Sequence, residues 1–162
     1  MTEPKPSEPK RSVFKPSEHK PRLTAVTLGV RDFHASLRFY EALGFARKLR
    51  STGDQIAFLD AGGVVLALYR WDELAQDAAF ESRPVGAGFR GTTLAWNCAS
   101  RAEVDAAFVC ALSAGASLLK AAQETSWGGY SGYFADPDGH PWEIVHVPGF
   151  AFSPEGRLLL PD

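Results

Sequence analysis

Residues 26–45 read VTLGVRDFHASLRFYEALGF and decide how the chain begins to fold. Apolar residues alternate with small or polar ones along 23–30, which predicts a strand whose helix-covered face holds Val26, Leu28 and Val30. Asp32 stands where a helix N-cap is expected, apolar residues recur behind it at helical spacing, and Gly44 is typical of a helix stop. The stretch therefore predicts a strand, a helix and a glycine turn.

The rest of the chain predicts that this unit is completed and then repeated. Strand-like segments that complete one β-α-β-β-β module lie at 45–50, 55–60 and 64–71. The same order returns as a strand at 89–98, a helix at 101–114 between Ser100 and Gly115, and strands at 117–122, 129–135 and 141–147. We expect an α+β fold built from two such modules.

Changes in composition set the boundaries of these parts. Residues 1–22 hold five of the eleven prolines and six basic against three acidic residues, so we expect a disordered N-terminal tail. Module one spans 23–71, a linker with a short helix spans 72–88, and module two spans 89–148. The extension at 149–162 carries an apolar LLL run, which we expect to pack on the body or on a second subunit.

Length, charge and cysteine content exclude several classes of protein. The chain has 162 residues, 45% hydrophobic and 22% charged, which is ordinary for a globular domain. It has no apolar run long enough to span a membrane and no secretory signal. A net charge of -2 argues against nucleic acid as a partner. Cys98 and Cys110 read as reduced thiols, so we expect a cytoplasmic protein.

Two motifs carry a resemblance to a known family. The stretch at 26–45 and the stretch GYFADPDGHPWEIV at 132–145 together resemble the vicinal oxygen chelate superfamily of glyoxalases, extradiol dioxygenases, and fosfomycin and bleomycin resistance proteins. The resemblance covers about 23–148 and implies an open, partly closed mixed β-barrel around a central cavity. Within the second motif, Asp136 to Gly139 have the residue types of a tight turn, which is the role we expect for them.

The resemblance also places the metal ligands of the metal-using members on this chain. Their two histidines, or equivalents, fall at Ala25 and Thr93, and their carboxylate falls at Glu143. Side chains alternate between the two faces of a strand, and this alternation turns these three positions toward the cavity. A catalytic zinc needs about three protein ligands, so one retained carboxylate predicts that this chain uses no metal and no other cofactor.

The same alternation leaves a small, polar cavity with aromatic residues near it, which favours the binding of a small molecule. Two of the candidates, Thr27 and Tyr133, resemble substrate-contacting residues of the fosfomycin-resistance branch. The candidate ligand-binding residues are Thr27, Thr93, Asn97, Trp127, Tyr130, Tyr133 and Glu143. For the aromatic residues the alternative is core packing. Glu143 could act as a base or contact a cationic ligand. The alternative for Glu143 is a hydrogen bond with a purely structural role.

Two functions follow from these expectations. The first is a metal-independent binding protein like the bleomycin-resistance branch, which sequesters an aromatic or cationic small molecule. The second is a glyoxalase-type lyase or isomerase that uses Glu143 with a divalent metal. Relatives often build their sites between two chains, and the apolar C-terminal run also favours a homodimer.

Overall fold

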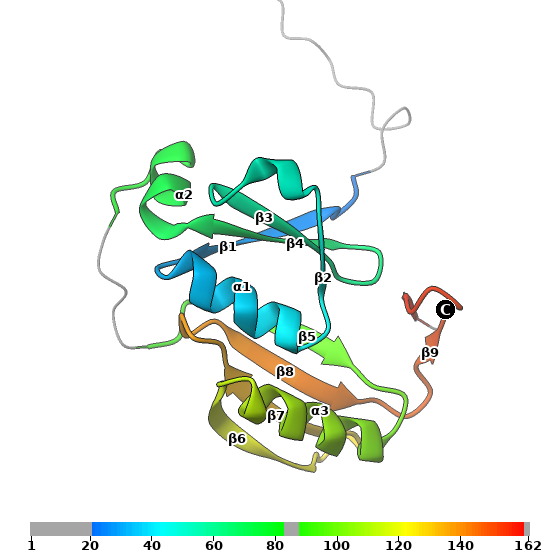
Figure 1. The fold of residues 1–162 in the computed structure, drawn as a ribbon. Coiled ribbons are helices and arrows are strands. Elements are labelled where there is room, and N and C mark those ends of the chain that lie inside the picture. The colour runs from blue at the N-terminus through cyan, green and yellow to red at the C-terminus, as the bar shows by residue number, and fades with distance from the viewer. Residues whose placement is uncertain (1–20, 83–87, 161–162) are drawn as a thin grey trace, which may run out of the picture.

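The structure is a computed structural model that describes residues 21–82 and 88–160. The predicted tail therefore lies outside the described residues except for Pro21 and Arg22, and so does the middle of the linker. No helix of the described part is long and apolar enough to cross a membrane. Figure 1 shows two sheets, one from each half of the chain, with helices packed against them.

The first half forms a mixed four-stranded sheet in the order β1-β4-β3-β2. The outer strand β1 pairs with β4 in parallel, and the other pairs are antiparallel. Its elements are β1 (Ala25–Val30), α1 (Phe33–Ala42), β2 (Ala46–Lys48), the 3-10 turn η1 (Arg50–Thr52), β3 (Ile56–Asp60) and β4 (Val65–Arg70). A short helix, α2 (Trp71–Asp77), follows directly.

The second half repeats this plan in the sheet order β5-β8-β7-β6, again with one parallel pair at the edge. Its elements are β5 (Leu94–Asn97), α3 (Arg101–Ser113), β6 (Ser117–Glu124), β7 (Tyr130–Ala135) and β8 (Pro141–His146). The extension adds a two-stranded hairpin of β9 (Ala151–Phe152) and β10 (Leu158–Leu159). The two matching sheets confirm the predicted α+β fold of two modules, and no closed barrel forms within the described chain.

The helix ends follow the local signals in the sequence. The Asp32 side chain accepts a hydrogen bond from the Ala35 amide at 2.9 Å, and Ser100 accepts one from the Glu103 amide at 3.2 Å. Such caps satisfy amides that the first turn of a helix leaves unpaired. Behind both helices the chain turns at a glycine with positive φ.

Three predicted strand boundaries are wrong. The strand expected at 89–98 begins only at Leu94, because Gly88 and Gly91 have positive φ and break the extended backbone. The strand expected at 45–50 is limited to Ala46–Lys48. Trp71 was expected at the end of a strand, but it begins α2, whose first turn carries two acidic residues that favour a helix N-terminus.

The core joins the two modules through α1. Phe39 and Tyr40 of this helix are almost fully buried. Their rings lie 6.3 Å from Phe134 and 6.0 Å from Trp142, both on strands of module two. Aromatic pairs at such centroid distances contribute about 1 kcal/mol each beyond the area they bury. Phe39 and Tyr40 are therefore core residues, and α1 contacts both sheets.

Candidate functional site

The turn between β7 and β8 fastens module two to module one. Tyr40 donates a hydrogen bond to Asp136 Oδ2 at 2.7 Å, and Ser36 Oγ donates one to Asp138 Oδ2 at 2.6 Å. The Arg31 amide donates to the other Asp138 oxygen at 2.8 Å. The turn predicted for these aspartates is present, and their buried carboxylates also bind the first module.

Two further contacts join the modules. His140 Nε2 donates to the Gly29 carbonyl at 2.8 Å, and Trp142 Nε1 donates to the Tyr40 hydroxyl at 3.1 Å. Burial, followed by the charge of Asp136 and the hydrogen bond to it, raises the pKa of Tyr40 well above its usual value. Burial also raises the pKa of Asp136. The Tyr40 hydroxyl therefore stays protonated as the donor at neutral pH.

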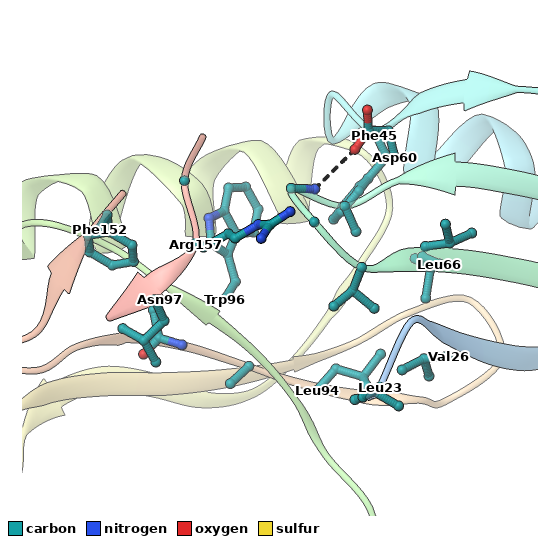
Figure 2. Close-up of a pocket in the computed structure, with 18 of the residues that line it drawn as sticks. Leu23, Val26, Phe45, Asp60, Leu66, Leu94, Trp96, Asn97, Phe152 and Arg157 are labelled. Carbon is teal, nitrogen blue, oxygen red and sulfur yellow. Dashed lines mark hydrogen bonds between the residues drawn. The ribbon is translucent and has the colours of Figure 1, made fainter. Parts of the chain in front are cut away.

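At the opposite end of β1 the two modules enclose a groove of about 1150 Å³ (Figure 2). Val26 and Leu66 line it from module one, and Leu94 and Trp96 line it from the edge strand of module two. Phe45, in the turn after α1, completes the apolar wall. The modules therefore meet at one end of β1 and leave a mainly apolar, partly aromatic groove at the other.

The C-terminal hairpin covers one side of this groove. Phe152, Arg157 and Leu158 all belong to its lining. Phe152 and Leu158 are paired across β9 and β10. The hairpin thus lies against the body of the chain, while Leu159 and Leu160 of the apolar run stay exposed.

The two acidic residues that line the groove already have partners. Asp60 Oδ1 accepts a hydrogen bond from the Gly62 amide at 3.2 Å, and its Oδ2 lies 3.8 Å from Lys48 Nζ. Glu103 Oε2 accepts from the Ala99 amide at 2.8 Å, at the start of α3. These carboxylates therefore hold local backbone in place.

Of the sequence-predicted binding residues, Tyr133 and Glu143 are brought together. They are directly paired across β7 and β8. On its other side Glu143 is paired with Ala95 of β5, so the three residues form one row across the sheet. Partial burial, then hydrogen bonding to Glu143 and its charge, raises the pKa of Tyr133. Both side chains lie on the face of the sheet away from α3.

The other predicted residues are spread over the molecule. Asn97 alone among them lines the groove. Thr27 is exposed on β1, and Thr93 is exposed in the loop before β5. Trp127 is 57% exposed in the β6–β7 hairpin.

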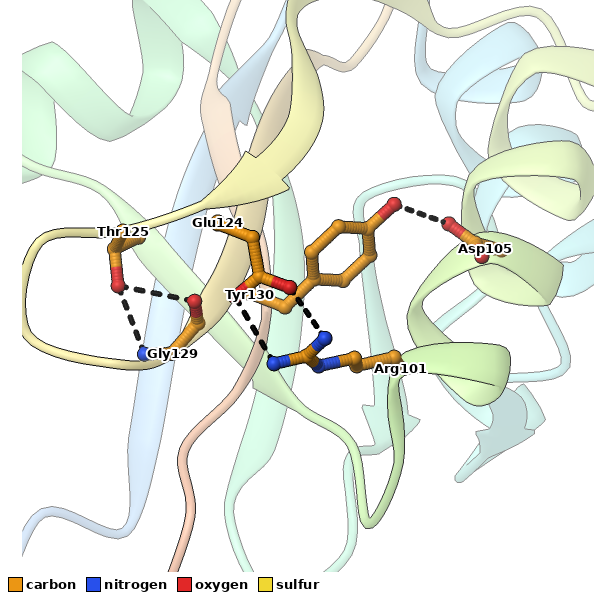
Figure 3. Close-up of polar contacts among 6 residues, drawn as sticks. All are labelled: Arg101, Asp105, Glu124, Thr125, Gly129 and Tyr130. Carbon is orange, nitrogen blue, oxygen red and sulfur yellow. Dashed lines mark hydrogen bonds and ion pairs between the residues drawn. The ribbon is translucent and has the colours of Figure 1, made fainter.

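Tyr130 lies on the opposite face of its sheet from Tyr133. Figure 3 shows the Tyr130 side chain directed toward Asp105 of α3. Its hydroxyl donates to Asp105 of α3 at 2.9 Å. The guanidinium of Arg101 lies 5.9 Å from its ring centroid and pairs with Glu124. These contacts tie α3 to its sheet, so the structure gives Tyr130 a packing role away from the groove.

The groove contains residues that sequence reasoning missed. Trp96 packs partly on the core, with its ring 6.5 Å from Phe45. Because β5 is an edge strand, Trp96 also lines the groove. The available signal in the sequence was a large aromatic residue, Trp96, within the strand expected at 89–98. Arg157 lies in the extension, where the sequence gave no such signal.

The residues around Glu143 do not fit a divalent metal. Its two cross-strand neighbours are Ala95 and Tyr133, neither of which is a usual ligand of such an ion. Nowhere in 21–82 or 88–160 do three histidine, cysteine, aspartate or glutamate side chains gather closely enough to hold one. We therefore derive no metal-dependent step for this chain.

Comparison with known proteins places the chain in a family. The model of the glyoxalase/bleomycin resistance protein/dioxygenase superfamily matches residues 22–144, so the chain belongs to this superfamily. The sequence has no significant match among curated proteins.

Solved structures share this fold. A glyoxalase-related enzyme from Fulvimarina pelagi is 34% identical with a TM-score of 0.76, over 86% of this chain and 97% of that one. A glyoxalase/bleomycin resistance protein/dioxygenase family enzyme from Burkholderia phytofirmans is 29% identical with a TM-score of 0.66, over 78% and 99%. Lactoylglutathione lyase from Agrobacterium tumefaciens, at 23% identity and a TM-score of 0.62 over 82% and 100%, shows the fold alone.

Proposed function

We propose that this chain is a cytoplasmic, metal-independent binding protein of its superfamily that holds an aromatic small molecule between its two modules. The observation that carries the proposal is the groove lined by Phe45, Leu94 and Trp96. An apolar concavity with aromatic walls and a few polar groups, here Asn97 and Arg157, is typical of a small-molecule site. The missing metal ligands around Glu143 favour binding over metal-assisted turnover.

The proposal includes assembly into a homodimer. The row of Ala95, Glu143 and Tyr133 lies on the sheet face that α3 does not cover, and Ala95 is exposed. On module one, Thr27 is exposed in the same way. A second copy that covers these faces would bury both rows. Light scattering that gives twice the chain mass supports this part, and a monomer at 100 µM contradicts it.

The test of binding uses three probes of one shape: 2-naphthoate, 2-naphthamide and 2-naphthylmethylammonium. Titration calorimetry on metal-free protein should show saturable binding of at least one probe, one molecule per chain. Trp96→Ala should weaken it about 10-fold, since an aromatic contact contributes on the order of 1.4 kcal/mol. Trp127→Ala, in the exposed hairpin, is the matched control and should bind like the wild type.

A second variant guards against damage to the core by Trp96→Ala. Phe152 lines the groove from the C-terminal hairpin and is half-buried outside the main core, so Phe152→Ala changes the groove without removing a core side chain. It should also weaken binding. The proposal fails if no probe binds, or if both groove variants bind like the Trp127→Ala control.

A lyase of glyoxalase type is the second candidate, because the similar protein from Fulvimarina pelagi is described as a glyoxalase-related enzyme. It predicts turnover of a 2-oxoaldehyde–thiol adduct that stops with EDTA and in Glu143→Gln. Turnover of that kind would replace the binding proposal. Its absence, with EDTA-resistant binding of a probe, would leave the binding proposal in place.

A further inference from the structure

Arg157 is presented to the groove by a tight turn in the C-terminal hairpin. The Ser153 amide donates to the Arg157 carbonyl at 2.9 Å, and the Gly156 amide donates to the Ser153 carbonyl at 2.9 Å. The Arg157 amide in turn donates to Ser153 Oγ at 3.2 Å. These bonds fix the backbone from which the arginine side chain extends.

The side chain crosses from the hairpin to module one. It passes over Gly63, where an added Cβ would lie 2.9 Å from Arg157 Nε. Gly63 also has a φ of +108°, so a glycine serves both the turn and the close approach. Figure 2 shows the arginine extending into the groove that Trp96 also lines.

The Arg157 guanidinium brings a positive charge to a groove that Arg22, Asp60 and Glu103 also line. No ion pair joins Arg157 to a carboxylate within 21–82 or 88–160. The groove acids Asp60 and Glu103 are bonded to their own backbone neighbours. A guanidinium offers a planar pair of N–H donors that matches a carboxylate, and it binds carboxylates more strongly than neutral acceptors.

We propose that the C-terminal hairpin is part of the binding site and that Arg157 binds the carboxylate of an aromatic acid whose ring lies against Trp96. This inference rests on the proposed function and narrows its ligand to an anion. The family match ends at residue 144, so the hairpin at 151–159 lies beyond the matched domain.

The order of affinities within the naphthyl probes tests this inference. Wild-type protein should bind 2-naphthoate at least 10-fold more tightly than 2-naphthamide or 2-naphthylmethylammonium, since a hydrogen bond to a charged group has about this effect. Arg157→Gln should reduce the affinity for 2-naphthoate to that for the amide and leave the amide unchanged. Arg157→Lys should retain part of the preference.

Arg38→Gln is the matched control, because Arg38 is an exposed arginine of α1 outside the groove. It should keep the wild-type order, and circular dichroism should show that all three variants fold. If the amide or the ammonium probe binds as tightly as 2-naphthoate and still depends on Trp96, the inference is wrong and the proposed function stands. If no probe binds, both are wrong.

Discussion

The Tyr40 hydroxyl donates a 2.7 Å hydrogen bond to the Asp136 carboxylate, and this bond joins α1 of module one to the β7–β8 turn of module two. Tyr40 is fully buried, and Asp136 is nearly so. The same hydroxyl accepts from Trp142 Nε1 at 3.1 Å. Because the groove lies between the two modules, the contacts of this pair also set the relative position of its walls.

Tyr40→Phe should destabilise the protein by about 2–3 kcal/mol, because it leaves the buried Oδ2 of Asp136 without its donor. The free energy of unfolding from urea titrations measures the loss. Tyr69→Phe is the matched control, since Tyr69 lies on β4 and its hydroxyl makes no hydrogen bond within 21–82 or 88–160. A loss below 0.5 kcal/mol, as is usual for surface substitutions, would show that the Tyr40–Asp136 bond does not hold the modules together.

Asp136 should make the protein less stable as the pH rises. Burial raises the pKa of this carboxyl in the folded state, so the folded state holds the proton more tightly than the unfolded chain does. Its contribution to stability is therefore largest below the unfolded pKa and falls as the pH rises through the folded pKa. The unfolding free energy of the wild type minus that of Asp136→Asn should decline from pH 4 to pH 7. A difference that increases with pH would contradict this.

Gly132→Ala should destabilise the protein by about 3 kcal/mol, the upper part of the range for overpacked sites. An added Cβ would lie 2.7 Å from the Ala122 amide nitrogen, the Lys120 carbonyl oxygen and Phe108, and neither backbone atom can move freely. Gly29→Ala is the comparison, since its Cβ would meet side-chain atoms of Trp71 at 3.1 Å. Thermal unfolding should show the larger loss for Gly132→Ala, and equal losses would be inconsistent with the packing of β7.

Cys98 should be the unreactive member of the two free thiols. Burial, followed by the charge of Glu103, raises its pKa to about 11, so very little thiolate forms at pH 7.5. Cys110 is half-buried on α3. A dithionitrobenzoate assay should therefore show one fast thiol per chain, which Cys110→Ser removes and Cys98→Ser does not. A fast reaction that survives in Cys110→Ser would contradict this.

Much of the fold could be predicted from the sequence, because local signals determine it. The alternation at Val26, Leu28 and Val30 identified the helix-covered face of β1, where Leu28 and Val30 are buried. The caps Asp32 and Ser100 fixed where two helices begin. These signals act within a few residues, so a single sequence contains them.

The site could be predicted less well, because it depends on how distant segments meet. Tyr40 and Asp136 are 96 positions apart, and nothing in the sequence indicates that they are bonded. Alternation placed Glu143 on the sheet face away from α3, where it lies, but this face is not the one that lines the groove. It could not show that the groove opens at the β5 edge, which Trp96 also lines, or that Arg157 returns from the extension to cover it.

Electron density for bound 2-naphthoate is the most direct test of where this protein holds its ligand. A crystal structure grown with the probe from metal-free protein should show the naphthyl ring in the groove beside Trp96, with the carboxylate on Arg157. Density on the outer sheet face beside Tyr133 and Glu143, or a metal ion held by Glu143, would contradict both the site and the metal-free binding proposed for it.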